Sequence, residues 1–254
     1  MKIRAVLTDL DGTLLEPDGR LCAEARGALA RLTAAGVPVL PVTSKTAAEV
    51  AWLLAELGLT GPAGFENGAG VLEQDGQVRL LAAALPVETL RRVADALRAA
   101  TGAPVRTIEE LADAELAALT GLGGDELGRA RRRQATLPLV VDAGWDEPLR
   151  AAAPPEVLLV RGNRFLHLQG RHAKADVVPA LLGAAPGDGV VVACGDAPND
   201  VELLRSGDVA VIVPSARGAD PVLGAAVPAA RVAPAPHGRG WALAMQALLD
   251  ESGR

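Results

Sequence analysis

The feature that most constrains the fold is a short apolar run near the N-terminus that stops at two acids. Residues 5–8 are rich in β-forming side chains, and Asp9 and Asp11 follow, before Gly12 and Thr13. Residues two apart in a strand point the same way, so both carboxylates are expected just beyond the carboxyl end of a buried strand. Two carboxylates that close repel each other unless a proton or a cation lies between them, and oxygen ligands favour a hard ion such as Mg²⁺. A strand followed by an ordinary Asp-Gly turn would have the same sequence.

The composition indicates a layered α/β protein. The 254 residues can bury one large core or two smaller ones, and with only 2% aromatic residues that core must consist of Ala, Leu and Val. The formal charge of −6 disfavours nucleic acid as a partner. Cys22 and Cys194 lack metal or redox spacing, which favours a reducing, cytoplasmic compartment. We expect no membrane span and no signal peptide, since no apolar run is long enough and the first strand begins at once.

Polar residues follow the second predicted strand as well. A helix, a strand and another helix are expected over residues 23–34, 37–42 and 47–57, and this βαβ order predicts a parallel sheet. Thr43, Ser44 and Lys45 would then lie at the same edge as the two acids, because ligands bind beyond the carboxyl ends of parallel strands. Hydroxyls and an ammonium at a helix start suit a phosphate; an ordinary Ser/Thr helix cap would also explain them.

The middle of the chain has a different pattern. A strand end at residues 64–69 and a hairpin of residues 71–73 and 78–80 precede a helix-rich, then strand-rich block. We therefore expect an α/β fold, a Rossmann-like doubly wound parallel sheet with an inserted α+β cap domain. The predicted core covers residues 1–82 and 167–254, and the predicted cap covers 83–166. Within the cap we expect helices at 86–100, 108–119 and 125–134, and strands at 137–141, 157–160 and 164–168; after it, helices at 175–182, 201–204 and 241–249, strands at 189–194 and 209–213, and mostly loop at 214–240.

Four signals stand in a fixed order at these strand ends and helix starts. They are the acidic turn at 9–13, the Thr-Ser-Lys at 43–45, Lys174, and the Gly-Asp-Ala-Pro-Asn-Asp at 195–200. Together they resemble the haloacid dehalogenase superfamily of phosphohydrolases, and the inserted module resembles its type IIB cap. The resemblance covers essentially the whole chain.

A closer resemblance is to the mannosyl-3-phosphoglycerate phosphatase family, carried by residues 41–46, 65–68, 119–122, 162–167 and 240–241. It implies a Mg²⁺-dependent phosphatase that acts on a small phosphorylated sugar or glycosyl phosphoglycerate and releases mannosylglycerate, a compatible solute. Glucosyl-3-phosphoglycerate or another sugar phosphate is the alternative substrate. A phosphomutase, or a catalytically silent sugar-phosphate-binding module, is the alternative function.

The resemblance also implies residue roles for the chemical step. Asp9 would be the nucleophile that forms an aspartyl-phosphate, and Asp11 the general acid and then base. Thr43 and Lys174 would hold the phosphoryl oxygens. The Mg²⁺ ligands would be Asp9, Asp11 through its carbonyl, Asp196 and Asp200.

Substrate recognition is predicted for Ser44, Lys45, Asn67, Arg131, Arg164, His167 and Asn199. Arg131 belongs to a basic cluster in a predicted helix, which is either a solvated face or a pocket for an anion. Arg164 and His167 are three apart on a predicted strand, so both face the site only if the strand bends. Relatives typically have Arg, Glu, an aromatic residue, any residue and Glu where this chain has Arg-Arg-Arg-Gln-Ala at 131–135. This departure bears on the substrate more than on the reaction.

Overall fold

The computed structural model describes residues 2–162 and 164–253, and a five-stranded parallel sheet forms its core. The strand order is β12-β11-β10-β1-β2, and each neighbouring pair is parallel. The crossovers between parallel strands are helical, as the βαβ pattern predicts. The strands are β1 (Ile3–Thr8), β2 (Val39–Pro41), β10 (Val190–Gly195), β11 (Val209–Ile212) and β12 (Arg231–Val232).

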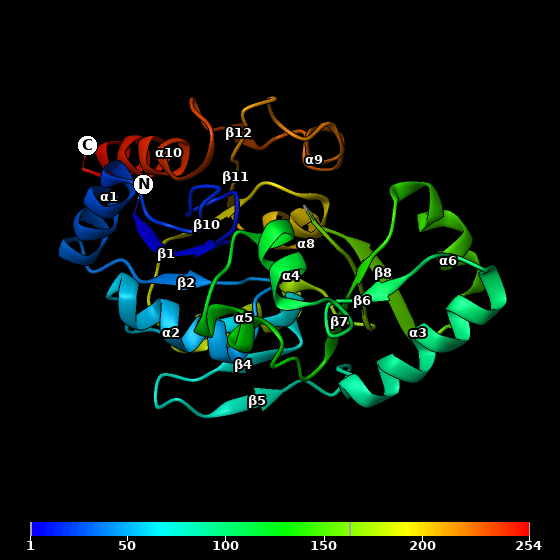
Figure 1. Ribbon diagram of the computed structural model, residues 1–254. Helices are drawn as coiled ribbons and strands as arrows, with labels where there is room; N and C mark the ends of the chain where they lie inside the picture. Colours follow the sequence, from blue (N-terminus) through cyan, green and yellow to red (C-terminus); the bar gives the residue numbers. More distant parts are fainter. Residues whose placement is uncertain (1, 163, 254) are drawn as a thin grey trace.

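Helices cover both faces of this sheet, which confirms the doubly wound arrangement (Figure 1). On β1, Val6 packs toward one face, and Ala5 and Leu7 pack toward the other. Trp241 is fully buried on the Val6 face and anchors the last helix there. The core helices are α1 (Ala23–Ala34) and α10 (His237–Ser252) on the Val6 face, α7 (Val178–Gly183) and α8 (Val201–Arg205) on the other, and α2 (Ala47–Leu57) and α9 (Pro221–Ala226) at the ends of the sheet.

A small antiparallel sheet extends the core beside β2. It contains β3 (Ala63–Phe65), β4 (Gly70–Leu72) and β5 (Val78–Leu80), so the hairpin predicted for residues 71–80 is confirmed. A parallel bridge between Val42 and Gly64 joins β3 to the end of β2. The turn after β3 is therefore brought to the same edge as the residues after β2.

The inserted module contains a four-stranded antiparallel sheet of order β6-β7-β9-β8. Leu90 and Leu97 of one helix and Leu149 of another pack on this sheet and form a second hydrophobic core. A further cluster around Leu116 and Leu127 lies under two short helices. The elements are β6 (Arg106–Thr107), β7 (Thr136–Val140), β8 (Val157–Arg161), β9 (Leu166–Gly170), α3 (Val87–Thr101), α4 (Asp113–Thr120), α5 (Asp125–Ala130) and α6 (Asp146–Ala152).

Several predicted boundaries in this module are wrong. Strand β9 continues to Gly170, so residues 167–170, predicted as core, pair in the cap sheet; we keep the two-domain division as a proposal with this boundary moved. The helix predicted at 108–119 begins only at Asp113, because the preceding segment forms β6. Helix α6 was not predicted, and residues 214–240 contain α9 and β12. No helix in the described part of the chain is long and apolar enough to span a membrane.

Candidate active site

Three carboxylates meet at the carboxyl edge of the parallel sheet. Asp9 follows β1, Asp196 follows the adjacent β10, and Asp200 ends the short 3-10 turn Pro198–Asp200. One carboxylate oxygen from each lies within 4.8 Å of the others. Gly195 allows this approach, since a Cβ there would lie 2.4 Å from the Asp200 Cβ. The three oxygens form a group that could hold a metal ion.

A buried lysine completes this centre. Lys174 is 1% exposed, and its Nζ lies 2.8 Å from Asp9 Oδ1 and 2.6 Å from Asp200 Oδ1. Its segment packs so tightly on the turn after β3 that a Cβ on Gly68 would lie 2.1 Å from the Ala173 carbonyl oxygen. Burial lowers the pKa of Lys174, but Asp200 and Asp9 outweigh it, so the pKa is raised and the ammonium stays charged.

Acidic groups outnumber basic ones among the described residues that make up this centre. The pKa of Asp9 is raised well above its usual 3.8. Burial is the largest cause, and the Asp200 and Asp196 carboxylates add to it; together they outweigh Lys174, which lowers the pKa. Three carboxylates against one ammonium leave an excess of two negative charges if all are ionised. The residues present therefore suit a divalent cation, which would favour the ionised form of Asp9.

Asp11 has a different partner. Its carboxylate is outside the group of three and forms an ion pair with Lys45, with 2.7 Å between Lys45 Nζ and Asp11 Oδ2. Burial would raise the pKa of Asp11, but Lys45 outweighs this, and the pKa is lowered. The two acids thus have different surroundings. Asp9 contacts Lys174 and is one of the group of three carboxylates, whereas Asp11 contacts Lys45.

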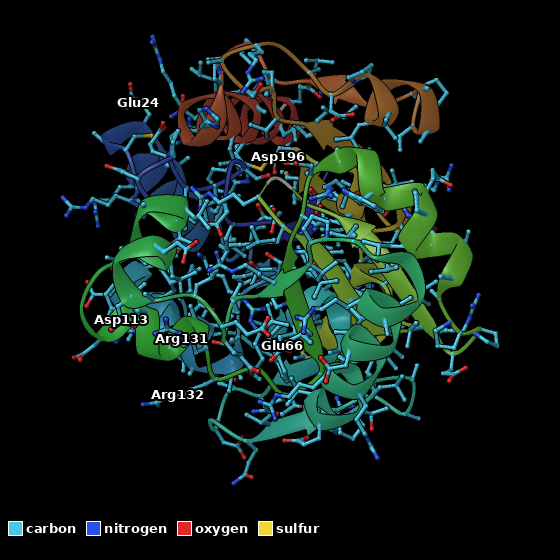
Figure 2. All side chains as sticks on the ribbon, turned by 45° about the vertical axis from the view of Figure 1, so that its right-hand side comes forward. Glu24, Glu66, Asp113, Arg131, Arg132 and Asp196 are labelled. Atoms are coloured by element: carbon cyan, nitrogen blue, oxygen red, sulfur yellow. The ribbon has the colours of Figure 1, made fainter. Side chains whose placement is uncertain are left out.

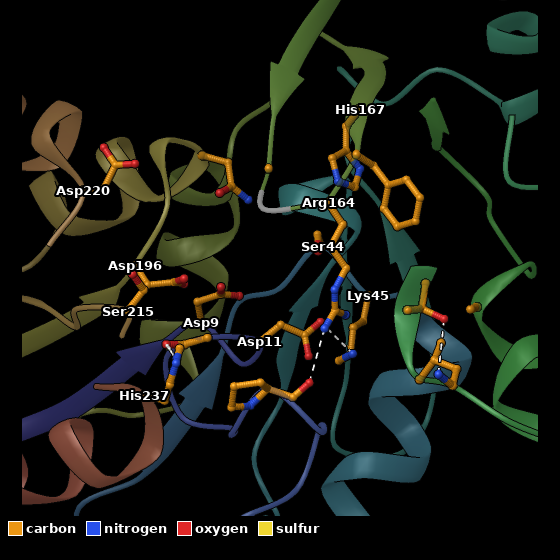
Figure 3. Close-up of a pocket in the computed structure, with 18 of the residues that line it drawn as sticks. Asp9, Asp11, Ser44, Lys45, Arg164, His167, Asp196, Ser215, Asp220 and His237 are labelled. Carbon is orange, nitrogen blue, oxygen red and sulfur yellow. Dashed lines mark hydrogen bonds and ion pairs between the residues drawn. The ribbon is translucent and has the colours of Figure 1, made fainter. Parts of the chain in front are cut away.

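A cavity of about 660 Å³ opens over Asp9 and Asp11, between the core and the inserted module (Figure 3). In Figure 3, Asp9, Asp196 and His237 lie on one side of Asp11, and Lys45, Arg164 and His167 lie on the other. Apolar residues of the inserted module form part of the wall. The polar lining includes Asp9, Asp11, Ser44, Lys45, Glu49, Arg133, Arg164, His167, Asp196, Asn199, Arg217 and His237, and the apolar wall includes Ile108, Leu116, Leu122 and Phe165.

The predicted substrate residues Ser44, Lys45, Arg164, His167 and Asn199 all line this cavity. Arg164 precedes β9, so Arg164 and His167 do not lie on opposite faces of one strand. Both side chains therefore line the cavity without a bend in the strand. The Arg164 Nη2 donates to the Pro17 carbonyl at 3.3 Å. Asn163, in the same motif, lies outside the described residues.

Three predicted residues lie beneath the cavity rather than on its wall. Thr43 is fully buried, and Lys174 lies below Asp9. Asn67 is buried between the two parts of the chain: its Nδ2 donates to Gln169 Oε1 at 3.0 Å, and its Oδ1 accepts from Asn199 Nδ2 at 3.2 Å. Asn67 therefore connects the cap strand β9 to the turn Pro198–Asp200 and is not among the residues that line the cavity.

Arg131 is placed away from the site, contrary to our prediction. Its guanidinium pairs with Asp113 and donates to the Leu111 carbonyl. Figure 2 shows Arg131 and Asp113 together at the outer edge of the molecule, away from Asp196. The helix predicted over 125–134 ends at Ala130, and beyond that end the neighbouring arginines diverge. Arg133, from the same basic cluster, lines the cavity instead.

Sequence reasoning also missed His237 and Arg217. His237 has a left-handed backbone (φ 52°), and its Nδ1 lies 3.3 Å from the carbonyl oxygen of Gly12, directly after the acids. Arg217 lines the cavity from the loop after β11. Both fall in the segment predicted as featureless loop, and no motif marked them.

His167 is expected to make folding pH-dependent. Burial, followed by the charges of Arg133, Lys174 and Arg161, lowers the pKa of His167 to about 3 from 6.5. As the pH falls below 6.5 the unfolded chain binds this proton and the folded chain does not, so stability is lost toward pH 3. Between pH 7 and pH 5 we expect His167→Gln to lose about 2 kcal/mol less unfolding free energy than the wild type. Urea unfolding of both proteins at the two pH values measures this difference. His172 is present in both proteins, so its contribution cancels in the comparison. Equal losses of unfolding free energy in the variant and the wild type would contradict the prediction.

The parallel sheet with acids at its carboxyl edge and an inserted antiparallel module is the fold of the haloacid dehalogenase-like hydrolases. The family model for haloacid dehalogenase-like hydrolases matches residues 6–110. A solved haloacid dehalogenase-like hydrolase from Bacteroides thetaiotaomicron is similar over 97% of this chain and 100% of its own, with 19% identity and a TM-score of 0.71. A subclass IIB sugar phosphatase of this superfamily is similar over 97% of this chain and 98% of its own, with 17% identity and a TM-score of 0.73. Residues 6–110 thus match the haloacid dehalogenase-like hydrolase family, and the whole chain has the fold of the solved haloacid dehalogenase-like hydrolases.

A curated relative gives a narrower similarity. The glucosyl-3-phosphoglycerate/mannosyl-3-phosphoglycerate phosphatase of Persephonella marina is 27% identical over 228 residues, which cover 82% of this chain and 84% of that protein. The match to this family, together with that relative, indicates a phosphatase.

Proposed function

We propose that the chain is a Mg²⁺-dependent phosphatase that hydrolyses mannosyl-3-phosphoglycerate to mannosylglycerate and phosphate. The observation that carries this proposal is the charge around the reactive acids. Lys45 and Arg164 lie on one side of Asp11 in the cavity, where a substrate with a second anionic group besides its phosphate would place that group. Arg133 lines the same cavity. A glycerate carboxylate is such a group. The free thiols of Cys22 and Cys194 support a cytoplasmic setting.

In the proposed reaction Asp9 is the nucleophile. Its carboxylate faces the cavity and is oriented from below by Lys174, with 2.8 Å between the Asp9 and Lys174 atoms. Attack on phosphorus forms an aspartyl-phosphate and breaks the bond between phosphorus and the 3-oxygen of the glycerate, which leaves with a proton as the alcohol of mannosylglycerate. Water then releases the phosphate from Asp9. The Lys174 charge stabilises the negative charge that develops at this position.

Asp11 is the proton carrier in this scheme. In the free enzyme Lys45 keeps its carboxylate ionised, which suits the base needed for the water step. A substrate anion that binds Lys45 would offset the charge that lowers the Asp11 pKa, so this pKa would rise toward its usual range. Asp11 can then hold the proton that it delivers to the leaving oxygen, so substrate binding sets the protonation state that the first step needs.

The metal site would be formed by Asp9, Asp196 and Asp200, with the Asp11 carbonyl as the further predicted ligand. Thr13 Oγ1 donates to Asp196 Oδ1 at 2.9 Å, and the amides of Asp196 and Ala197 donate to Asp200 Oδ2 at 3.0 Å each, so two ligand carboxylates are held in place by the protein. All-oxygen ligands favour Mg²⁺, which when bound would reduce the repulsion between the nucleophile and the phosphate.

Glucosyl-3-phosphoglycerate is the second candidate substrate, because the Persephonella marina relative is named for both compounds. The two substrates share phosphate and carboxylate and differ in one sugar hydroxyl orientation. His237, on the other side of Asp11 from Lys45, and Arg217 also line the cavity and could contact sugar hydroxyls.

A substrate panel tests the proposal. We expect kcat/KM for mannosyl-3-phosphoglycerate to exceed that for simple sugar phosphates such as mannose 6-phosphate by at least about 100-fold, the effect of one charged contact of about 3 kcal/mol. Lys45→Met should remove most of this preference while Arg131→Met, outside the cavity, should keep it. Equal kcat/KM values for both substrate classes in the wild type would rule out the glycerate specificity and leave only a general sugar phosphatase.

A further inference from the structure

The loop that carries Thr43, Ser44 and Lys45 is held by its three successive carbonyl groups. The Asn67 amide donates to the Thr43 carbonyl at 2.9 Å, and the Glu66 amide donates to the Lys45 carbonyl at 2.8 Å. Both donors come from the core, from a turn in which Glu66 and Asn67 have left-handed backbones (φ 46° and 58°). The Ser44 carbonyl between them has a partner of a different kind.

That partner is Arg133 of the inserted module. Its Nη1 donates to the Ser44 carbonyl at 2.6 Å. The same guanidinium is fixed by hydrogen bonds to the Ala130 carbonyl (3.1 Å) and Thr136 Oγ1 (3.2 Å), and lies 3.9 Å from the Glu49 carboxylate. Its side chain is only 8% exposed, so its orientation is set by these contacts. One residue of the cap thus reaches the centre of the loop that holds Lys45 against Asp11.

A reciprocal contact keeps Arg133 in this place. The fully buried Glu66 carboxylate accepts the amides of Gln134, Ala135 and Thr136, at 2.9, 2.9 and 2.7 Å. The residues directly after Arg133 are therefore bound to the same core turn that holds the other two loop carbonyls. Two contacts therefore join the cap to the core here: the cap residue Arg133 binds a carbonyl of the core loop, and the core residue Glu66 binds amides of the cap.

We infer that Arg133 is a positioning residue for the reaction: by binding the Ser44 carbonyl it fixes Lys45 on Asp11, and it does so only when the cap lies against the core. Without it, the Ser44 carbonyl loses its partner and the loop can rotate between its two remaining anchors. Lys45 then leaves Asp11, and the proton carrier is no longer held. This inference rests on the proposed phosphatase function and adds a residue to it.

Steady-state kinetics with p-nitrophenyl phosphate and saturating Mg²⁺ test the inference, because this substrate has no sugar or carboxylate for the cap to bind. Arg133→Met should lower kcat about 10- to 100-fold, the cost of an unpaired buried partner of a charged group, with KM changed less than about two-fold. Arg133→Lys should keep part of kcat. Guanidinium chloride at low, non-denaturing concentration should restore part of kcat in Arg133→Ala. Arg132→Met, one residue away and exposed, is the matched control and should behave as the wild type.

The outcomes separate the alternatives. A wild-type kcat in folded Arg133→Met, or a rise in KM alone, would overturn the positioning role. A further outcome is a variant with a lower melting temperature and a loss of kcat that guanidinium does not restore. That result would show that Arg133 has a purely structural role and would also overturn the positioning role. If Arg133→Met does not fold, Arg133→Gln, too short to reach the Ser44 carbonyl, replaces it. If the wild type hydrolyses no phosphate ester, the proposed function fails and the inference with it; if it does and Arg133→Met matches it, only the inference fails.

Discussion

Asp9→Asn should reduce phosphate release by at least about 10⁴-fold, because it removes the nucleophile and leaves no other group to accept the phosphoryl. The same substitution should raise the unfolding free energy of the metal-free protein. Burial and the neighbouring carboxylates raise the pKa of Asp9, so its charged form is disfavoured in the folded state, and a neutral amide avoids that cost. Loss of activity with gain in stability is the signature expected of a residue selected for chemistry.

The measurements are phosphate release from p-nitrophenyl phosphate and urea unfolding in the presence of a chelator. Asp75→Asn, at an exposed turn of the β4–β5 hairpin, is the matched control and should change neither quantity. Activity of Asp9→Asn within about ten-fold of the wild type would contradict nucleophilic catalysis by Asp9. A clear fall in its stability would contradict the charge balance described for this centre.

Lys174→Met should have the opposite effect on stability. Lys174 is 1% exposed and is the cation that contacts both Asp9 and Asp200. Its removal leaves two buried carboxylates without this partner, which should lower the unfolding free energy by about 3–5 kcal/mol. It should also lower kcat by about 10²–10³-fold, the usual effect of removing one preorganised electrostatic group. Methionine keeps the length of the side chain, so the loss reports the charge.

Lys2→Met is the control for this variant, since Lys2 is exposed before β1 and the chain has only three lysines. Mg²⁺ should recover more stability in Lys174→Met than in the wild type, because the cation then compensates carboxylates that have lost their lysine. If the unfolding free energies of Lys174→Met and the wild type differ by less than about 1 kcal/mol, Lys174 does not stabilise the buried carboxylates of the site.

The core and its reactive edge could be predicted from the sequence because local rules determine them. A strand places Asp9 and Asp11 on one side, a βαβ crossover brings Lys45 to the same edge, and the structure joins Lys45 to Asp11. The contacts of Lys174 with Asp9 and Asp200 followed only from the family resemblance. Nothing local in the sequence marks a lysine at a helix start as buried.

The cap could be predicted only in outline. Four residues of β9 were assigned to the wrong part, because β9 is an interior, fully buried strand of the cap sheet and its apolar sequence resembles that of a core strand. The choice between Arg131 and Arg133 depends on where α5 ends and on the Ser44 and Glu66 contacts, all of which are long-range. His237 reaches Gly12 across 225 residues of chain, through a left-handed backbone that no periodic pattern indicates.

The most direct test of the account is to trap the phosphorylated enzyme. The wild-type protein is mixed with ³²P-labelled substrate and Mg²⁺, quenched in acid within milliseconds, digested, and the labelled peptide is sequenced. We predict acid-stable, base-labile label on the peptide that contains Asp9, absent in Asp9→Asn and absent when a chelator replaces Mg²⁺. Turnover by the wild type with no label on this peptide at any quench time, or label on another residue, would contradict phosphoryl transfer through Asp9.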